Sequence, residues 1–293
     1  MTATTETETE TIAPDLAWLP MPSPESFRYE ERDRVGIITL DRPERYNALT
    51  FQVYNELTEF FKVIAGRTRD PSGTGARALV LQGEGRAFCG GGDVDDIITR
   101  LHARDAEGLL TFTRMTGALI QAMRMCPLPI VASVKRVAAG AGAVMALAAD
   151  LRVIGEHAFF AFLFPQVGLS GADMGASYLL PRVVGLGHAS EILMLGGRVD
   201  AAKASQIGLV NRVVGDEPER ANVDREAFGL AAQLAAGPHF ALRMTKRMLQ
   251  QELSMDLDAA IEAEAQAQTL CMQHPDFREA DDARLDKRSP QWR

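Results

Sequence analysis

The sequence predicts an α/β fold, and three observations support this prediction. Short apolar runs typical of strands alternate along the chain with stretches of helical periodicity. Two of these runs end in glycine-rich turns that lead into a helical segment. The chain has 293 residues and is 46% hydrophobic, which is enough for one core domain and a helical C-terminal part.

The strands and helices follow from this alternation in chain order. Strands are expected at residues 35–40, 78–82, 130–134 and 151–154. Helices are expected at residues 51–64, 109–125, 143–149 and 190–195, and the pattern is helical from Asn222 onward, including residues 256–271.

The N-terminus is acidic and of low complexity. Its sequence, TATTETETETIAPD, cannot bury apolar surface, so we expect a disordered tail over residues 1–24. The catalytic core is expected over residues 25–215, and a helical C-terminal region over residues 216–293.

A glycine-rich turn, GEGRAFCGGGD, spans residues 83–93 and follows the second predicted strand. Gly90, Gly91 and Gly92 carry no Cβ, so a substrate oxygen can approach main-chain N–H groups closely here. Acidic residues from Asp93 onward precede an apolar periodic run, which indicates a helix N-terminus with a favourable dipole. The sequence therefore predicts a main-chain N–H near Gly92 in a positive local field.

A second turn, formed by Gly140, Ala141 and Gly142, opens the helix predicted at residues 143–149. That helix is apolar on every side, so we expect it in the core. Two helix N-termini directed at one carbonyl oxygen would stabilise an enolate or a tetrahedral oxyanion. Either turn alone is better explained as a tight strand-to-helix connection, but the pair in this order is more specific.

Together with other segments, the two turns resemble the crotonase family, the enoyl-CoA hydratase/isomerase superfamily. The resemblance runs from Tyr29 to the C-terminus and also rests on ITLDRPERYNALT, PIVASVKRVAAGAG, VGLSGADMGASYLLPRVVG, AKASQIGLVNRVV and HPDFREADDARLDKR. It implies a spiral core of ββα repeats with a helical C-terminal region for trimerisation and for covering the CoA site. It further implies an acyl-CoA substrate, a homotrimer or a hexamer, and no organic cofactor or metal.

The resemblance also implies roles for individual residues. The backbone N–H groups of Gly92 and Ala141 would hold the thioester carbonyl oxygen. Arg45 and Ala48 fall in the segment that lines the pantetheine and adenine, and Gly90 and Gly92 lie in the turn that accepts the adenine amine.

Three further basic residues, Lys287, Lys135 and Arg136, have no single assigned role. Lys287 matches a C-terminal partner of a CoA phosphate, but a solvated cluster of terminal charges also explains it. Lys135 and Arg136 replace the family's usual Asn-Gly pair before the second turn, and sequence reasoning gives no interpretation of them.

Residues 100–108 resemble the mobile loop that lines the family's acyl pocket.

Both glutamates that typical hydratases of the family use are missing. The first position falls at Val144 and the second at Phe164 or Pro165, and no carboxylate lies near either one in the sequence. The usual two-carboxylate hydration mechanism therefore cannot be transferred intact. Phe164 instead indicates a drier acyl-binding pocket for a bulky or planar group.

Asp173 is the one acid that remains in this neighbourhood. It matches the aspartate of dienoyl-CoA isomerases and ring-modifying enoyl-CoA isomerases, and also the nucleophilic aspartate of chlorobenzoyl-CoA dehalogenases. Without the family, capping of the helix that begins near MGASYLL is the better explanation. Near the aromatic run AFFAFLFP, a desolvated carboxylate would have a raised pKa and would suit proton transfer.

Three functions follow from these observations. The first is an enoyl-CoA isomerase or hydratase/dehydratase in which Asp173 shuttles a proton. The second is an acyl-CoA hydrolase or dehalogenase-like enzyme with Asp173 as nucleophile, although residues 109–125 lack the histidine base of the dehalogenases. The third is a CoA-binding pseudoenzyme.

Composition narrows the class of protein. A net charge of −8 and a pI near 5.3 argue against broad nucleic-acid binding. Three cysteines and five scattered histidines show neither a disulfide framework nor metal-ligand spacing. The sequence shows no signal peptide and no apolar run long enough to span a bilayer, so we expect a cytoplasmic protein without membrane partners.

Overall fold

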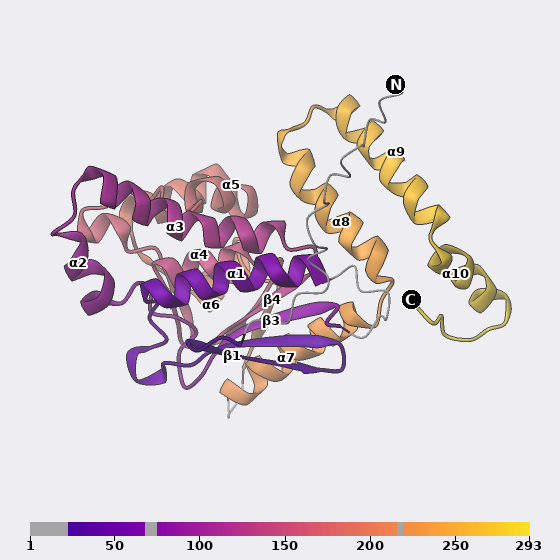
Figure 1. Ribbon diagram of the computed structural model, residues 1–293, viewed down its shortest axis with the longest axis horizontal. Helices are drawn as coiled ribbons and strands as arrows, with labels where there is room; N and C mark the ends of the chain where they lie inside the picture. Colours follow the sequence, from indigo (N-terminus) through magenta and orange to yellow (C-terminus); the bar gives the residue numbers. More distant parts are fainter. Residues whose placement is uncertain (1–22, 68–74, 216–218) are drawn as a thin grey trace, which may run out of the picture.

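A six-stranded sheet forms the centre of the molecule (Figure 1). The computed structural model describes residues 23–67, 75–215 and 219–293, so most of the predicted N-terminal tail lies outside the described residues. β1 is antiparallel to β2, and the other neighbouring strands are parallel. The strands, in spatial order, are β1 Phe27–Arg32, β2 Val35–Leu40, β3 Ala78–Gly83, β4 Ile130–Val134, β6 Leu151–Gly155 and β9 Arg212–Val214.

A second, smaller sheet consists of β5 Val137–Ala139, β7 Phe159–Ala161 and β8 Arg198–Asp200, with β7 in the middle. β5 is parallel to β7, and β8 is antiparallel to it. Because β5 follows β4 after two residues, the chain passes from the large sheet to the small one just before the second glycine turn.

Helices and short helical turns connect the strands. They are η2 Pro43–Arg45, α1 Phe51–Arg67, η3 Val94–Ile98, α2 Thr99–Leu101, α3 Ala106–Met125, α4 Ala141–Ala148, η4 Phe164–Val167, α5 Ala176–Leu195, α6 Ala201–Gln206, α7 Glu219–Ala235, α8 His239–Gln251, η5 Glu252–Ser254, α9 Leu257–Gln273 and α10 Pro275–Leu285.

Side-chain alternation along the strands assigns each residue to one of two cores. In β2, Ile37 faces the smaller core with α7, whereas the next residue, Ile38, faces the larger core with α1, α3 and α4. Val80 and Leu81 in β3 divide in the same way. Period-two alternation therefore places helices on both faces of the sheet, as Figure 1 shows for α1 and α7.

The α/β prediction is confirmed. The sequence analysis did not predict β1, β5, β7, β8 and β9, and the elements that it did predict differ from the structure mainly at their ends. The strands at 35–40 and 130–134 have the predicted bounds, and the other two extend by one residue. The helix predicted at 190–195 is the end of the longer α5, in which Gly185 (φ 79°, ψ 158°) interrupts the helical conformation. The expected loop at 100–108 is partly helical, because α2 and the start of α3 occupy it.

The C-terminal helices α8, α9 and α10 form an arm that leaves the sheet (Figure 1). The buried Lys246 of α8 attaches the arm to the core. The Nζ of Lys246 lies 2.6 Å from Asp150 Oδ2 and donates to Leu128 O at 2.7 Å. Asp150 also accepts the N–H of Ile130 at 2.8 Å. One side chain therefore ties the arm to the starts of β4 and β6. None of the helices in the described ranges could cross a membrane.

Lys246→Met should lower the free energy of unfolding by about 2 kcal/mol, because it leaves Asp150 without its nearest cation in a largely buried position. Lys62→Met is the control, since Lys62 pairs with Glu59 at an exposed position and should change stability by less than about 0.5 kcal/mol. Urea unfolding of both variants measures the difference. Equal effects would contradict the proposed anchoring of the arm.

Candidate functional site

The two glycine turns lie against each other. The first turn is residues 83–93, which start at the end of β3. The second turn is Gly140, Ala141 and Gly142, at the junction of β5 and α4. Cys89 N donates to Val137 O at 3.1 Å, and Ala139 N donates to Cys89 O at 2.9 Å. These bonds form an isolated parallel bridge between Cys89 and Ala138, which sets the register between the turns.

Glycine is required where the turns meet. Gly91 has φ +102°, and a Cβ built on it would lie 3.0 Å from Ala139 O and 3.8 Å from Ala141 N. A Cβ on Gly142 would lie only 2.4 Å from Cys89 O. Side chains at these positions would push the two backbones apart, so the glycines permit their contact.

Among the described residues, nothing accepts a hydrogen bond from the N–H groups of Gly92 and Ala141. Leu49 N donates to Gly91 O at 2.8 Å and Asp93 N donates to Leu49 O at 2.9 Å, so the Gly92 N–H points away from Leu49. Ala141 is the first residue of α4, where an N–H has no intrahelical partner. Among the hydrogen bonds of the described residues, neither N–H is a donor.

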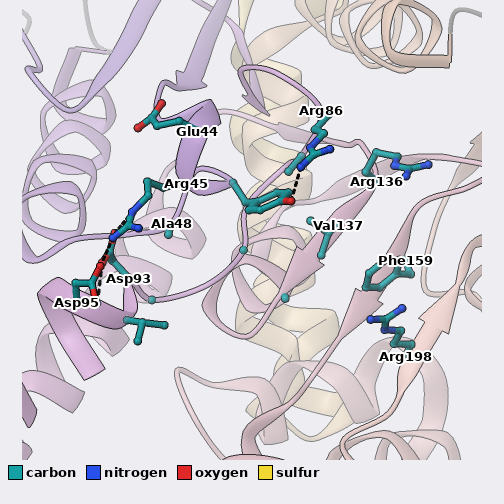
Figure 2. Close-up of a pocket in the computed structure, with 16 residues that line it drawn as sticks. Glu44, Arg45, Ala48, Arg86, Asp93, Asp95, Arg136, Val137, Phe159 and Arg198 are labelled. Carbon is teal, nitrogen blue, oxygen red and sulfur yellow. Dashed lines mark hydrogen bonds and ion pairs between the residues drawn. The ribbon is translucent and has the colours of Figure 1, made fainter. Parts of the chain in front are cut away.

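The first turn borders a cavity of about 770 Å³, drawn in Figure 2. Of the three predicted catalytic residues, Gly92 lines this cavity, whereas Ala141 and Asp173 are not among its lining residues. Four predicted binding residues line it together, namely Arg45, Ala48, Gly90 and Gly92. Ala139, the last residue of β5 and the one before the second turn, lines it as well. The structure therefore brings the predicted pantetheine and adenine segment to the same cavity as the first turn.

Asn47 holds the loop before α1 against the first turn. Its side chain is buried, its φ is 55°, and its Nδ2 donates to Glu84 O and Ala87 O, both at 2.9 Å. Its Oδ1 accepts the N–H of Arg42 at 2.9 Å. Sequence reasoning missed this role, although the tolerance of asparagine for left-handed conformations is a usable signal.

Asp93 closes the first turn. Its side chain accepts the N–H groups of Asp95 and Asp96 at 3.0 and 3.1 Å and lies 3.0 Å from Arg42. Burial alone would raise the pKa of Asp93, but these hydrogen bonds and Arg42 outweigh it and lower the pKa below its ordinary value. The predicted helix after Asp93 is confirmed only as a short π-helical turn, η3.

Asp173 lies just before α5 and is partly buried. Burial raises the pKa of its carboxyl above the ordinary value of 3.8, and the N–H of Met174 opposes this shift. The capping explanation is wrong, because Gly175 is the N-cap of α5 and no side chain caps that helix. The main-chain oxygen of Asp173 accepts the N–H of Ala176, the first residue of α5, at 2.8 Å.

Tyr54 of α1 places a buried hydroxyl close to the segment that contains Asp173. Its buried hydroxyl lies 4.0 Å from the Sδ of Met174, the residue after Asp173. Burial raises the pKa of Tyr54 well above 10, and the charges of Cys89 and Asp173 raise it further. The three groups therefore share one neighbourhood. Sequence reasoning missed Tyr54, whose only signal was a place in an amphipathic helix.

Phe164 and Lys287 do not line the 770 Å³ cavity. Phe164 is buried in the larger core, as are Phe160 and Phe162, so this aromatic run mainly packs the fold. Lys287 follows α10 at the end of the arm and is exposed. The binding roles of Phe164 and Lys287 stay predictions. Within the described residues, no group of three or more His, Cys, Asp and Glu side chains could hold a metal ion.

Comparisons with known proteins agree with this geometry. The family model for enoyl-CoA hydratase/isomerase matches residues 30–293. A Rhodobacter capsulatus protein provisionally named an enoyl-CoA hydratase is 37% identical and covers 91% of this chain and 97% of its own. The 1,2-epoxyphenylacetyl-CoA isomerase of Escherichia coli K12 is 33% identical, with coverage of 88% and 94%.

A crystal structure from Streptomyces coelicolor A3(2), also provisionally named an enoyl-CoA hydratase, has a TM-score of 0.88 and 46% identity. The match covers 99% of both chains. The crotonase-like fold that the resemblance implied is therefore confirmed, including the helical C-terminal region.

Gly142→Ala should lower the free energy of unfolding by about 1–3 kcal/mol, because its Cβ would collide with Cys89 O and separate the turns. Gly229→Ala is the matched control in α7, where a Cβ meets nothing within 4 Å. It should raise stability by about 0.5–1 kcal/mol through helix propensity. Urea unfolding checks both signs, and a gain for Gly142→Ala would refute the close contact.

Proposed function

Because the chain belongs to the enoyl-CoA hydratase/isomerase family, we propose that it acts on an unsaturated acyl-CoA thioester through an enolate intermediate. The observation that carries this proposal is the pair of unbonded N–H groups, Gly92 and Ala141, on two turns in contact. The E. coli relative is named for a CoA thioester substrate and for isomerisation, which supports the same substrate class here.

The two N–H groups are assigned to the thioester carbonyl oxygen. As a proton leaves the carbon next to the carbonyl, the electron pair moves onto this oxygen, and both donors stabilise the negative charge that develops. Fixed main-chain donors need no reorganisation during the reaction, and each is worth about 3 kcal/mol of transition-state stabilisation.

Asp173 is assigned the proton transfer. Its ionised carboxylate would take a proton from one carbon of the enoyl group and return it to another, which shifts the double bond without net gain or loss of atoms. Burial supports this role, because the raised pKa makes Asp173 a stronger base than an exposed aspartate.

Isomerisation fits the site better than hydration. Hydration needs one group to activate water and another to deliver a proton. Isomerisation needs only one carboxylate, which first accepts a proton from the substrate and then returns it to another carbon. By the resemblance, the two glutamate positions of hydratases fall at Val144 and at Phe164 or Pro165, and none of these carries a carboxylate. Val144 and Phe164 are buried. Hydration/dehydration therefore requires a second group that has not been identified. No observation favours the hydrolase, dehalogenase or pseudoenzyme alternatives.

We also propose that the arm contacts other copies of the chain, as the homotrimer or hexamer implied by the family requires. Large apolar side chains are exposed along it, including Leu257, Ile261, Leu270, Phe277 and Leu285. Sedimentation equilibrium should give the mass of three or six chains, and a single-chain mass would contradict the assignment. The cytoplasmic localisation stays a prediction.

Asp173→Asn should reduce kcat for an unsaturated acyl-CoA by at least about 100-fold. In the wild type, kcat/KM should fall as the pH drops through the raised pKa of Asp173, because the base must be ionised. A panel of enoyl-CoA substrates, with products resolved by mass, measures turnover and separates isomers from hydrated products. Unchanged turnover in the variant would refute the role of Asp173.

Stability shows whether the Asp173→Asn variant remains folded. Because the pKa of Asp173 is higher in the folded state, its ionised form destabilises the fold above that pKa, and the effect disappears below about 3.8. The variant should therefore be at least as stable as the wild type at pH 7. Asp33→Asn, in the exposed turn between β1 and β2 where φ is 52°, is the control and should keep full activity.

Ala141→Pro removes one proposed donor while keeping a residue that helices tolerate at their first position. We expect kcat to fall by about 100-fold or more, since the carbonyl oxygen loses one of two N–H groups. Circular dichroism should show an unchanged fold, and free CoA should still bind. Near-normal kcat in this variant would exclude the Ala141 N–H as a donor.

A further inference from the structure

Three arginines form one wall of the 770 Å³ cavity, and we refer to Arg86, Arg136 and Arg198 as the arginine wall. Figure 2 shows their side chains on one side of the cavity, with Glu44, Arg45, Asp93 and Asp95 on the opposite side. All three arginines are exposed. They come from three different segments: the first turn, the residue before β5, and the first residue of β8.

Arg136 occupies a position that is unfavourable for its side chain. Its φ is 50°, in the left-handed region where glycine is preferred, and glycine is the usual family residue there. Its main-chain oxygen accepts the N–H of Phe159 at 2.9 Å, a contact that any residue could make. In the described part of the chain, its guanidinium has no hydrogen bond or ion pair. The fold therefore gives no structural reason for an arginine here.

The other two arginines are held in place by aromatic rings. The guanidinium of Arg198 lies 4.5 Å from the ring centroid of Phe159, on the neighbouring strand β7. Arg86 lies 4.8 Å from the centroid of Tyr46 and donates to its hydroxyl. Stacking orients a guanidinium but does not neutralise its charge.

The acids of the cavity do not neutralise this wall. Asp93 lies 3.0 Å from Arg42, and Asp95 accepts a hydrogen bond from Arg45, so both are paired on the far side. Glu44, the third acid that lines the cavity, also lies on that side in Figure 2, and no ion pair among the described residues joins it to the wall. Three uncompensated guanidinium groups thus face one cavity in a chain whose net charge is −8. A concentration of positive charge against that background indicates an anionic ligand.

We propose that the arginine wall binds the phosphate groups of the substrate's coenzyme A portion, an inference that rests on the proposed function. Arginine suits phosphate esters because its planar fork can donate two parallel hydrogen bonds to them. Gly90 and Gly92 border the same cavity, so a ligand whose thioester reaches the first turn can extend along the wall. In this proposal, the phosphate contact of the Arg136 side chain offsets the unfavourable left-handed conformation of its backbone.

This assignment changes the origin of the phosphate contacts. The resemblance implied Lys287 of the C-terminal region, whereas the arginine wall belongs to the core and lines the cavity in a single chain. Lys135, the other unexplained residue, has a separate structural role. Its buried Nζ pairs with Asp224 Oδ2 of α7 at 2.7 Å.

The test compares Arg136→Gln, Arg198→Gln and the double variant, using acyl-CoA, acyl-dephospho-CoA and the acyl-pantetheine thioester as substrates. Each substitution should raise KM for acyl-CoA about tenfold and leave kcat unchanged. KM for the pantetheine thioester, which has no phosphoadenosine, should not change. Dephospho-CoA separates the 3′-phosphate from the diphosphate as the group bound. Equal losses with the pantetheine thioester, or no loss with acyl-CoA, would overturn the proposal.

Arg136→Gly adds a readout that a structural role would not give. Glycine relieves the left-handed strain, so the Tm should stay the same or rise while affinity for CoA falls about tenfold. Arg32→Gln is the matched control, because Arg32 also stacks on an aromatic ring, 4.0 Å from the centroid of Phe228, outside the cavity. It should leave affinity for CoA unchanged. A Tm lowered by Arg136→Gly with unchanged affinity would contradict the proposal.

Titration calorimetry with free CoA keeps this inference separate from the proposed reaction, because binding requires no turnover. If no thioester is turned over but the arginine variants bind CoA about tenfold more weakly than the wild type, the wall stands and the proposed reaction fails. If turnover is normal and affinity for CoA is unchanged in the double variant, the wall fails and the proposed reaction stands.

Discussion

The direct contact between the two glycine turns is the constraint on which the site depends. The backbones approach so closely that a Cβ on Gly142 would lie 2.4 Å from Cys89 O. The sheet makes this approach possible, because β3 and β4 are parallel neighbours and the chain continues from β4 into β5. The turns that follow β3 and β5 therefore meet at the same end of the core, as loops after parallel strands do in open α/β sheets.

The fold and the main-chain part of the site could be predicted because their signals are local. Runs of apolar residues marked β2 and β4 with their observed bounds, and the glycines of both turns stand in the sequence itself. The resemblance to the family assigned Arg45 and Gly90 to the binding of one ligand, and the structure brings both to one cavity. Predictions were wrong where a boundary has no strong signal, as at the start of α5, or where a common capping pattern suggested a role for Asp173.

The arginine wall and Tyr54 could not be predicted because they depend on long-range packing. Arg198 and Arg136 lie on the same side of the cavity because β7 pairs with both β5 and β8. Each of these three strands has only three residues, which is too short for a periodic pattern to be detected in the sequence. Tyr54 meets the neighbourhood of Asp173 across 120 positions of sequence, through Met174. Such encounters follow from the topology of the chain and not from any single segment.

Main-chain donors make the proposed oxygen-binding site largely independent of side-chain identity. Substitutions at side chains such as Val144 and Phe164 leave the N–H groups of Gly92 and Ala141 in place, because these donors belong to the main chain. A lineage can thus exchange its acid–base groups and explore new reactions while activation of the thioester persists. The contact between the glycine turns would therefore keep the two donors in position while the side chains around them change.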